Sequence, residues 1–172
     1  GVPVGVMNLV LGRGADMGDA LLRDVDALSF TGSTPVGRAL LTRAAARMTK
    51  VQLELGGKNP TLVFADSQWR EHLDTLVRSA FQNSGQICLC GSRVLIERSI
   101  YTEFRDALVE RAQQLRVGDP IDEDNQLGPL VSRAHFDKVV NALQRARDEG
   151  GKVLCGGHAL DRPGWFVAAT VI

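Results

Sequence analysis

The sequence lacks an excess of charge of either sign, because 20 Lys and Arg balance 20 Asp and Glu. This balance excludes a polybasic arm for nucleic acid and an acidic disordered tail. The chain also lacks an apolar run of the roughly 18 residues that a membrane-spanning helix needs. It has only 3 cysteines, too few for a disulfide scaffold. We therefore expect a cytoplasmic protein that binds neither nucleic acid nor a membrane.

The sequence also lacks a charged segment followed by an apolar core at its start, so we expect no secretory leader in it. The chain opens on Gly1 and closes on the strand-like Thr170, Val171 and Ile172. We expect it to be a piece of a longer protein. What is present is 172 residues, 44% hydrophobic and 23% charged, as in an ordinary globular protein.

Strand-like and helix-like segments alternate along the chain. Short apolar runs predict strands or extended chain at residues 6–11, 27–30, 51–55, 61–64, 93–97, 152–155 and 165–172. Apolar residues at spacings of three and four predict helices at 17–22 and after Pro35, Asp66 or Ser67, Ser99 and Ser132. Such alternation predicts an α/β fold with mainly parallel strands. The Gly56-Gly57 pair predicts a boundary between residues 1–56 and 57–172.

The first candidate site is the turn Phe30-Thr31-Gly32-Ser33-Thr34, between a predicted strand and a predicted helix. Glycine lets the backbone approach a ligand, and free N–H groups at the start of a helix favour an anion such as pyrophosphate. An ordinary strand-to-helix turn is the alternative, because the segment is not the GxGxxG fingerprint.

The second and third candidates are Glu54 and Cys88. Glu54 ends a predicted strand beside two glycines and is placed to act as a general base, unless it is simply solvated or paired with Lys58. Cys88 follows a broken helix, where a cleft could receive a nucleophilic thiol; a buried structural cysteine is the alternative. The spacing of Cys88 and Cys90 is C-x-C, and no histidine is near them in sequence, so we expect no metal site.

Three segments in this order closely resemble the aldehyde dehydrogenase superfamily. They are Phe30-Thr31-Gly32-Ser33-Thr34-x-x-Gly37, Leu53-Glu54-Leu55-Gly56-Gly57-Lys58-Asn59-Pro60, and Phe81-x-Asn83-x-Gly85-Gln86-x-Cys88. The resemblance covers essentially the whole chain. It implies parts of a Rossmann-type cofactor domain (1–56, its C-terminal part) and of an α/β catalytic domain (57–172, its N-terminal part).

The resemblance also implies oxidation of a small-molecule aldehyde to a carboxylic acid, with NAD as cofactor and NADP not excluded. Cys88 is then the nucleophile that forms a thiohemiacetal and a thioester, and Glu54 activates the water that hydrolyses the thioester. The N–H of Cys88 is an expected donor to the oxyanion. The cofactor-binding residues implied are Gly32, Ser33, Gly37, Leu55 and Gly14.

Within the superfamily, Gln86-Ile87-Cys88-Leu89-Cys90-Gly91-Ser92-Arg93 is similar to the branch that acts on 2-aminomuconic and 2-hydroxymuconic semialdehydes. The family's oxyanion-hole asparagine and its acidic residue for the nicotinamide ribose fall in segments outside these 172 residues. We therefore expect the 172-residue chain alone to be inactive or nearly so, and the full-length form to be a homo-oligomer.

Two other functions stay open. A cysteine hydrolase of another fold would need His135 or His158 beside Cys88 or Cys90. A catalytically incomplete fragment of the enzyme would only fold or associate.

Overall fold

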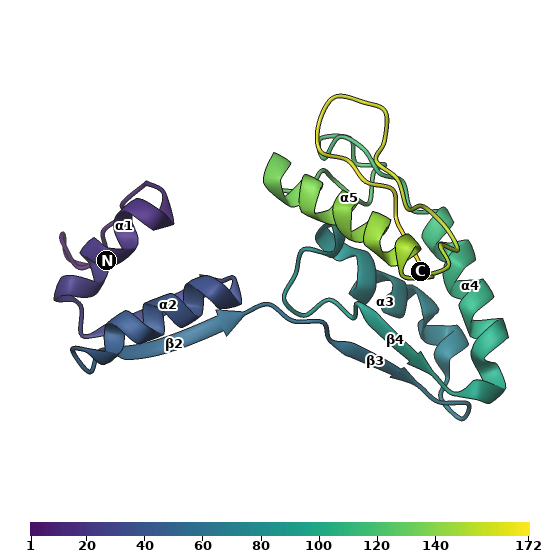
Figure 1. The fold of residues 1–172 in the computed structure, drawn as a ribbon, viewed down its shortest axis with the longest axis horizontal. Helices are drawn as coiled ribbons and strands as arrows, with labels where there is room; N and C mark the ends of the chain where they lie inside the picture. The colour runs from purple at the N-terminus through teal and green to yellow at the C-terminus, as the bar shows by residue number, and fades with distance from the viewer. The chain divides into compact units, whose positions relative to one another are not determined.

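The computed structural model describes the backbone of residues 1–172 and the side chains of residues 1–14 and 16–172. The chain divides into two compact units, Gly1–Gly56 and Gly57–Ile172. Within each unit strands alternate with helices, except that the last two helices follow one another without a strand between them, and both strand pairs are parallel. The predicted α/β fold is therefore confirmed (Figure 1).

The first unit is a parallel strand pair with two helices. Its elements are α1 (Gly14–Asp24), β1 (Ala27–Gly32), α2 (Thr34–Ala45) and β2 (Lys50–Leu55). The register runs from Ala27 opposite Lys50 to Gly32 opposite Leu55. Alternate strand residues Leu28, Phe30 and Val51 pack against the buried Leu22, Leu40 and Ala44 of the helices. The period of two in the strands thus gives one face to the helices and leaves the other face to solvent.

The predicted strand at residues 6–11 is wrong. No strand forms there, and the side chains of Leu9 and Leu11 are 86% and 85% exposed. A strand needs a neighbour to satisfy its backbone groups, and none of the described strands pairs with this segment. An apolar run alone therefore did not suffice to predict a strand.

The second unit packs two helices against another parallel strand pair. Its elements are β3 (Pro60–Val63), α3 (Trp69–Phe81), the 3-10 helix η1 (Gln82–Gly85), β4 (Arg93–Ile96), the 3-10 helix η2 (Arg98–Ile100), α4 (Tyr101–Gln113) and α5 (Arg133–Asp148). The core joins Val63 of β3 to Trp69 and Val77 of α3 and to Phe104 and Leu108 of α4. The Trp69 and Phe104 rings meet edge to face at 5.1 Å between centroids.

Of the side chains expected to cap the helices that follow them (Asp66 or Ser67, Ser99 and Ser132), only Ser132 does so. The Ser132 hydroxyl accepts a hydrogen bond from the His135 N–H at 3.2 Å and caps α5. The caps predicted for α3 and α4 are wrong, since those helices begin at Trp69 and Tyr101 without a side-chain cap. The Ser67 hydroxyl instead donates to the Phe64 carbonyl at 2.6 Å. A serine can satisfy a turn as readily as a helix start, so residue type did not decide between them.

The last 20 residues run as irregular chain with isolated bridges, not as the predicted strand at 152–155. Cys155 bridges Val171 in antiparallel fashion. Gly156 and Gly157 have φ of +66° and +80°, which turns the chain away from a strand path just after Cys155. Among the described residues, no helix is both long and apolar enough to cross a membrane.

Candidate active site

Cys88 occupies a corner of a tight turn with its side chain exposed. The Cys90 N–H donates to the Ile87 carbonyl at 3.1 Å, which closes a four-residue turn with Cys88 in its second position. Cys88 is exposed, whereas Cys90 and Cys155 are buried, and all three are free thiols. The Cys88 N–H donates to no acceptor among the described residues. One residue thus presents both an accessible thiol and an unused hydrogen-bond donor.

A strained segment leads from α3 into this turn. Asn83, Ser84 and Gly85 have φ of 52°, 55° and 72°, so three successive residues are left-handed. Such a conformation costs energy for non-glycine residues and persists only where the surroundings enforce it. The Ser84 hydroxyl donates to the Gly128 carbonyl at 2.8 Å, and the Val131 N–H donates to the Gln86 side chain at 3.0 Å. The loop before α5 therefore holds this segment in place.

The side chain of Asn59 holds the Cys88 turn from another side. Its amide donates to the Cys88 carbonyl at 2.6 Å and to the Cys90 carbonyl at 3.2 Å. Asn59 belongs to the motif from Leu53 to Pro60, in which residue type alone indicated no role for it. Because 29 residues separate Asn59 from Cys88, no local pattern could have predicted this contact.

An open groove of about 390 Å³ lies beside the turn. It is lined by Thr75, Arg78, Ser79, Gln82, Ile87, Leu89 and Cys90. Arg78 is the only charged group in this lining, and its guanidinium makes none of the ion pairs found among the described residues. Cys88 itself does not line the groove, but its neighbours Ile87 and Leu89 do, so the groove offers an unpaired positive charge beside the Cys88 turn.

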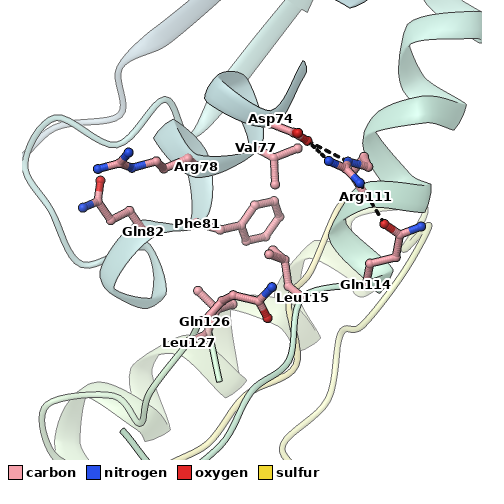
Figure 2. A pocket seen from close by; sticks show the side chains of 10 residues that line it. All are labelled: Asp74, Val77, Arg78, Phe81, Gln82, Arg111, Gln114, Leu115, Gln126 and Leu127. Carbon is pink, nitrogen blue, oxygen red and sulfur yellow. Dashed lines mark hydrogen bonds and ion pairs between the residues drawn. The ribbon is translucent and has the colours of Figure 1, made fainter. Parts of the chain in front are cut away.

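A second cavity of about 440 Å³ lies between α3, α4 and the loop that follows α4. Figure 2 shows Phe81, Val77 and Leu115 turned toward its interior. Asp74 and Arg111 pair at its edge, with 2.7 Å between the Arg111 Nε and an Asp74 carboxylate oxygen. Cys88 does not line this cavity. Arg78 also lines it, as it does the groove beside the Cys88 turn, and adds a positive charge to the Asp74–Arg111 ion pair.

Two ionisable groups in this unit have shifted pKa values. Hydrogen bonds from the Ala65 N–H and the Ser99 hydroxyl lower the pKa of Glu97. Burial raises the pKa of Cys155, an effect partly offset by a hydrogen bond with the Val171 backbone. Both groups lie outside the Cys88 turn and its groove, so we assign them to structure.

In the first unit, Glu54 lies near the carboxyl end of β2 on the face that points away from the helices. Its partner across the strand pair is Thr31 of β1, and both residues are exposed. Glu54 belongs to the first unit and Cys88 to the second. Their placement around one cavity stays a prediction.

The predicted dinucleotide turn lies where β1 ends and α2 begins. Ser33 is the N-cap of α2, and its hydroxyl makes no capping hydrogen bond. Gly37 is buried against Leu55, because a Cβ there would lie 2.7 Å from a Leu55 methyl carbon. Gly14 begins α1, where a Cβ would meet nothing within 4 Å. An open helix start at the carboxyl end of parallel strands fits a pyrophosphate.

The histidines take no visible part in the site. His158 contacts the Gly156 carbonyl at 3.1 Å, and His135 contributes its backbone N–H to the Ser132 cap. The cysteine hydrolase alternative requires a histidine hydrogen-bonded to a cysteine sulfur. No histidine of the described residues makes such a bond. Within the same residues, no group of three or more His, Cys, Asp or Glu could hold a metal ion.

Comparisons with known proteins agree with one another. The family model described as the aldehyde dehydrogenase family matches residues 1–172. A 2-aminomuconic semialdehyde dehydrogenase from Bos taurus is 44% identical over 181 residues, which cover 100% of this chain and 37% of that protein. A betaine aldehyde dehydrogenase from Cereibacter sphaeroides is 43% identical over 173 residues, which cover 99% of this chain and 36% of that protein.

Solved structures give the same result. The crystal structure of a betaine aldehyde dehydrogenase from Staphylococcus aureus in complex with NAD+ matches with a TM-score of 0.93 and 35% identity. The match covers 99% of this chain and 35% of that one.

Proposed function

Because this chain belongs to the aldehyde dehydrogenase family, we propose that it supplies the nucleophile and the general base for NAD-dependent oxidation of an aldehyde to a carboxylic acid. Cys88 is the nucleophile and Glu54 the base. The chain spans 37% of the length of the bovine relative. The proposed activity is therefore that of an enzyme in which residues 1–172 form the cofactor turn and the thiol site.

The proposed chemistry divides between the two residues. The Cys88 thiolate attacks the aldehyde carbon, and the former carbonyl oxygen becomes a thiohemiacetal alkoxide. When this oxygen re-forms its double bond, a hydride leaves the carbon and a thioester remains on sulfur. The chemistry that NAD+ supplies when bound is acceptance of this hydride. Glu54 then takes a proton from the water that adds to the thioester, and breakage of the C–S bond releases the acid and the thiol.

The observation that carries the proposal is the state of Cys88. It is exposed on a turn braced by long-range hydrogen bonds, and its N–H is free among the described residues to meet an oxyanion. A buried structural cysteine, the alternative open at the sequence level, would resemble Cys90 or Cys155 instead.

The positions of the predicted cofactor residues support binding of NAD+ by residues 1–56. Gly32 and Ser33 precede α2, where the N–H groups on either side of Pro35, which has none itself, favour a pyrophosphate. Gly37 and Leu55 bring α2 close to the end of β2, beside Glu54. We assign residues 1–56 to the cofactor domain and residues 57–172 to the catalytic domain on these grounds.

We further propose that the aldehyde carries a carboxylate, as 2-aminomuconic and 2-hydroxymuconic semialdehydes do. The unpaired Arg78 in the groove beside the Cys88 turn supports this class, since a guanidinium binds a carboxylate through charged hydrogen bonds. The same cation disfavours a quaternary ammonium substrate such as betaine aldehyde. A cytoplasmic location and a homo-oligomeric full-length form stay predictions.

A chimera tests the proposal. Residues 1–172 replace the matching segment of the bovine 2-aminomuconic semialdehyde dehydrogenase, and NADH formation is measured with 2-hydroxymuconic semialdehyde and with betaine aldehyde. We expect the first substrate to be preferred and Cys88→Ala to abolish turnover. Arg78→Gln should raise KM for the acidic substrate about tenfold, a loss of roughly 1.4 kcal/mol, and Arg78→Lys much less.

Four outcomes would contradict these claims. Turnover by the Cys88→Ala chimera would show that Cys88 is not the nucleophile. Equal effects of Arg78→Gln on both substrates would show that Arg78 does not select for a carboxylate. A third arm assays the 172-residue chain alone, for which steady NADH production would contradict the expected inactivity. Hydrolysis of a peptide without NAD+, together with no NADH from either aldehyde, would favour the cysteine hydrolase instead.

A further inference from the structure

The backbone of Asn59 is held in place by the neighbouring strand pair. It immediately precedes β3, and its carbonyl accepts a hydrogen bond from the Arg93 N–H at 3.2 Å. The next residue, Pro60, stands opposite Arg93 in the parallel register. The Asn59 amide therefore projects from a fixed point at the end of the β3–β4 pair.

Both hydrogen bonds from this amide end on the Cys88 turn. They reach the carbonyls of Cys88 and Cys90, at 2.6 Å and 3.2 Å, from a single nitrogen. A carbonyl held in one direction fixes the plane of its peptide, and hence the ψ angle of the residue that carries it. Asn59 thus fixes one side of Cys88, while the Cys90-to-Ile87 hydrogen bond at 3.1 Å fixes the turn as a whole.

We propose that Asn59 is a positioning residue for Cys88. It holds the peptide plane so that the thiol faces the aldehyde carbon while the Cys88 N–H faces the oxygen that becomes negative. Asn59 acts through the backbone and makes no hydrogen bond to the Cys88 sulfur. The inference rests on the proposed role of Cys88 as nucleophile. It adds that the orientation of Cys88 depends on Asn59, a residue of the preceding motif.

The expected effect is large on rate and small on binding. Misplacement of a reacting group by about 1 Å can cost on the order of a hundredfold in rate. Asn59 is not among the residues that line the groove beside Cys88, so aldehyde affinity should change little. A positioning role therefore predicts a lower kcat at nearly constant KM.

The test uses three variants in the chimera described above. Asn59→Leu keeps the approximate size and removes both donors, and Asn59→Ser restores one short donor. The control is Asn125→Leu, because the Asn125 amide also donates two hydrogen bonds, at 3.1 Å each, to the Asp119 carbonyl and the Asp122 side chain. Active sites are counted from the burst of NADH, and kcat is expressed per active site.

We expect Asn59→Leu to lower kcat by 10- to 100-fold, on the order of the misplacement effect, with KM for the aldehyde within about twofold. Asn59→Ser should recover part of the loss, and Asn125→Leu should leave kcat unchanged. An unchanged kcat in Asn59→Leu overturns the inference. So does a loss explained entirely by fewer active sites, since that is a folding defect. Failure of Cys88 itself as nucleophile is read separately, from turnover by Cys88→Ala.

A second measurement needs no turnover and uses the 172-residue chain. Hydrogen exchange of the Cys90 N–H reports the turn, and exchange of β4 amides reports the strand pair next to it. Asn59→Leu should speed exchange at Cys90 by tenfold or more, on the order of one lost hydrogen bond, and leave β4 unchanged. Equal exchange at Cys90 in the variant and the parent chain overturns the inference.

Discussion

The three cysteines of this chain have three different surroundings. Cys88 is exposed on its turn, Cys90 is buried with its thiol 3.8 Å from the Gln82 carbonyl, and Cys155 is buried near the Ala169 carbonyl. Motif order singled out Cys88 from the sequence, but exposure could not be read from residue type, since a lone cysteine is usually buried. The left-handed backbone at Asn83 and Ser84 could not be predicted either, because the sequence showed only that the helix pattern ends there.

Alkylation should separate the three thiols. With iodoacetamide at about pH 8, we expect Cys88 to be modified first and Cys90 and Cys155 only on unfolding. Burial raises the pKa of Cys155, so less of its reactive thiolate exists at this pH than for an ordinary thiol. Mass spectrometry of peptides gives the order, with Cys88→Ser as control. Modification of Cys155 before Cys88 would contradict the described burial.

At the scale of elements, helical periodicity was the reliable signal. The predicted apolar face of α3 holds the buried Trp69 and Val77, because a stripe at spacings of three and four has to meet a core. Contacts between distant segments could not be predicted in this way. The bond from Ser84 to Gly128 joins residues 44 apart, and its existence depends on how two loops meet in the folded unit.

Phe104 should be the most sensitive position of α4. Its side chain is 0% exposed and packs against Trp69 of α3. We expect Phe104→Ala to lower the free energy of unfolding of the second unit by about 3 to 5 kcal/mol, because it removes buried surface and leaves a cavity. Urea unfolding measures the loss. Phe64→Ala is the matched control, since Phe64 is 56% exposed and should cost far less.

At the scale of the whole chain, the two units differ in how much core they hold. The buried apolar side chains described in residues 1–56 are Leu22, Leu40 and Ala44, and the others lie in residues 57–172. A domain below about 70 residues is marginally stable even with a good core. The Gly56-Gly57 pair predicted a small first part. The exposure of residues 6–11 could not be predicted, because their apolar side chains indicated a buried strand.

Unfolding of the chain should therefore occur in two steps. We expect residues 1–56 to unfold at lower urea concentration than residues 57–172, because they bury fewer apolar groups. Hydrogen exchange with mass spectrometry, read separately for peptides of α2 and α4, measures both transitions. A single transition shared by all peptides would show that the two units depend on each other for stability.

The bracing of the Cys88 turn also bears on how such enzymes can diversify. The hydrogen bonds described around that turn join residues of the same unit. The Asn59 amide donates to the turn, and the carbonyls of Ser79 and Gly128 accept from the Gly91 N–H and the Ser84 hydroxyl on either side of it. A genetic crossover at the Gly56-Gly57 pair would exchange residues 1–56 for another lineage's version and carry the Cys88 thiol across with its supports intact. Under the proposed function, coenzyme preference and nucleophile geometry would then be inherited separately.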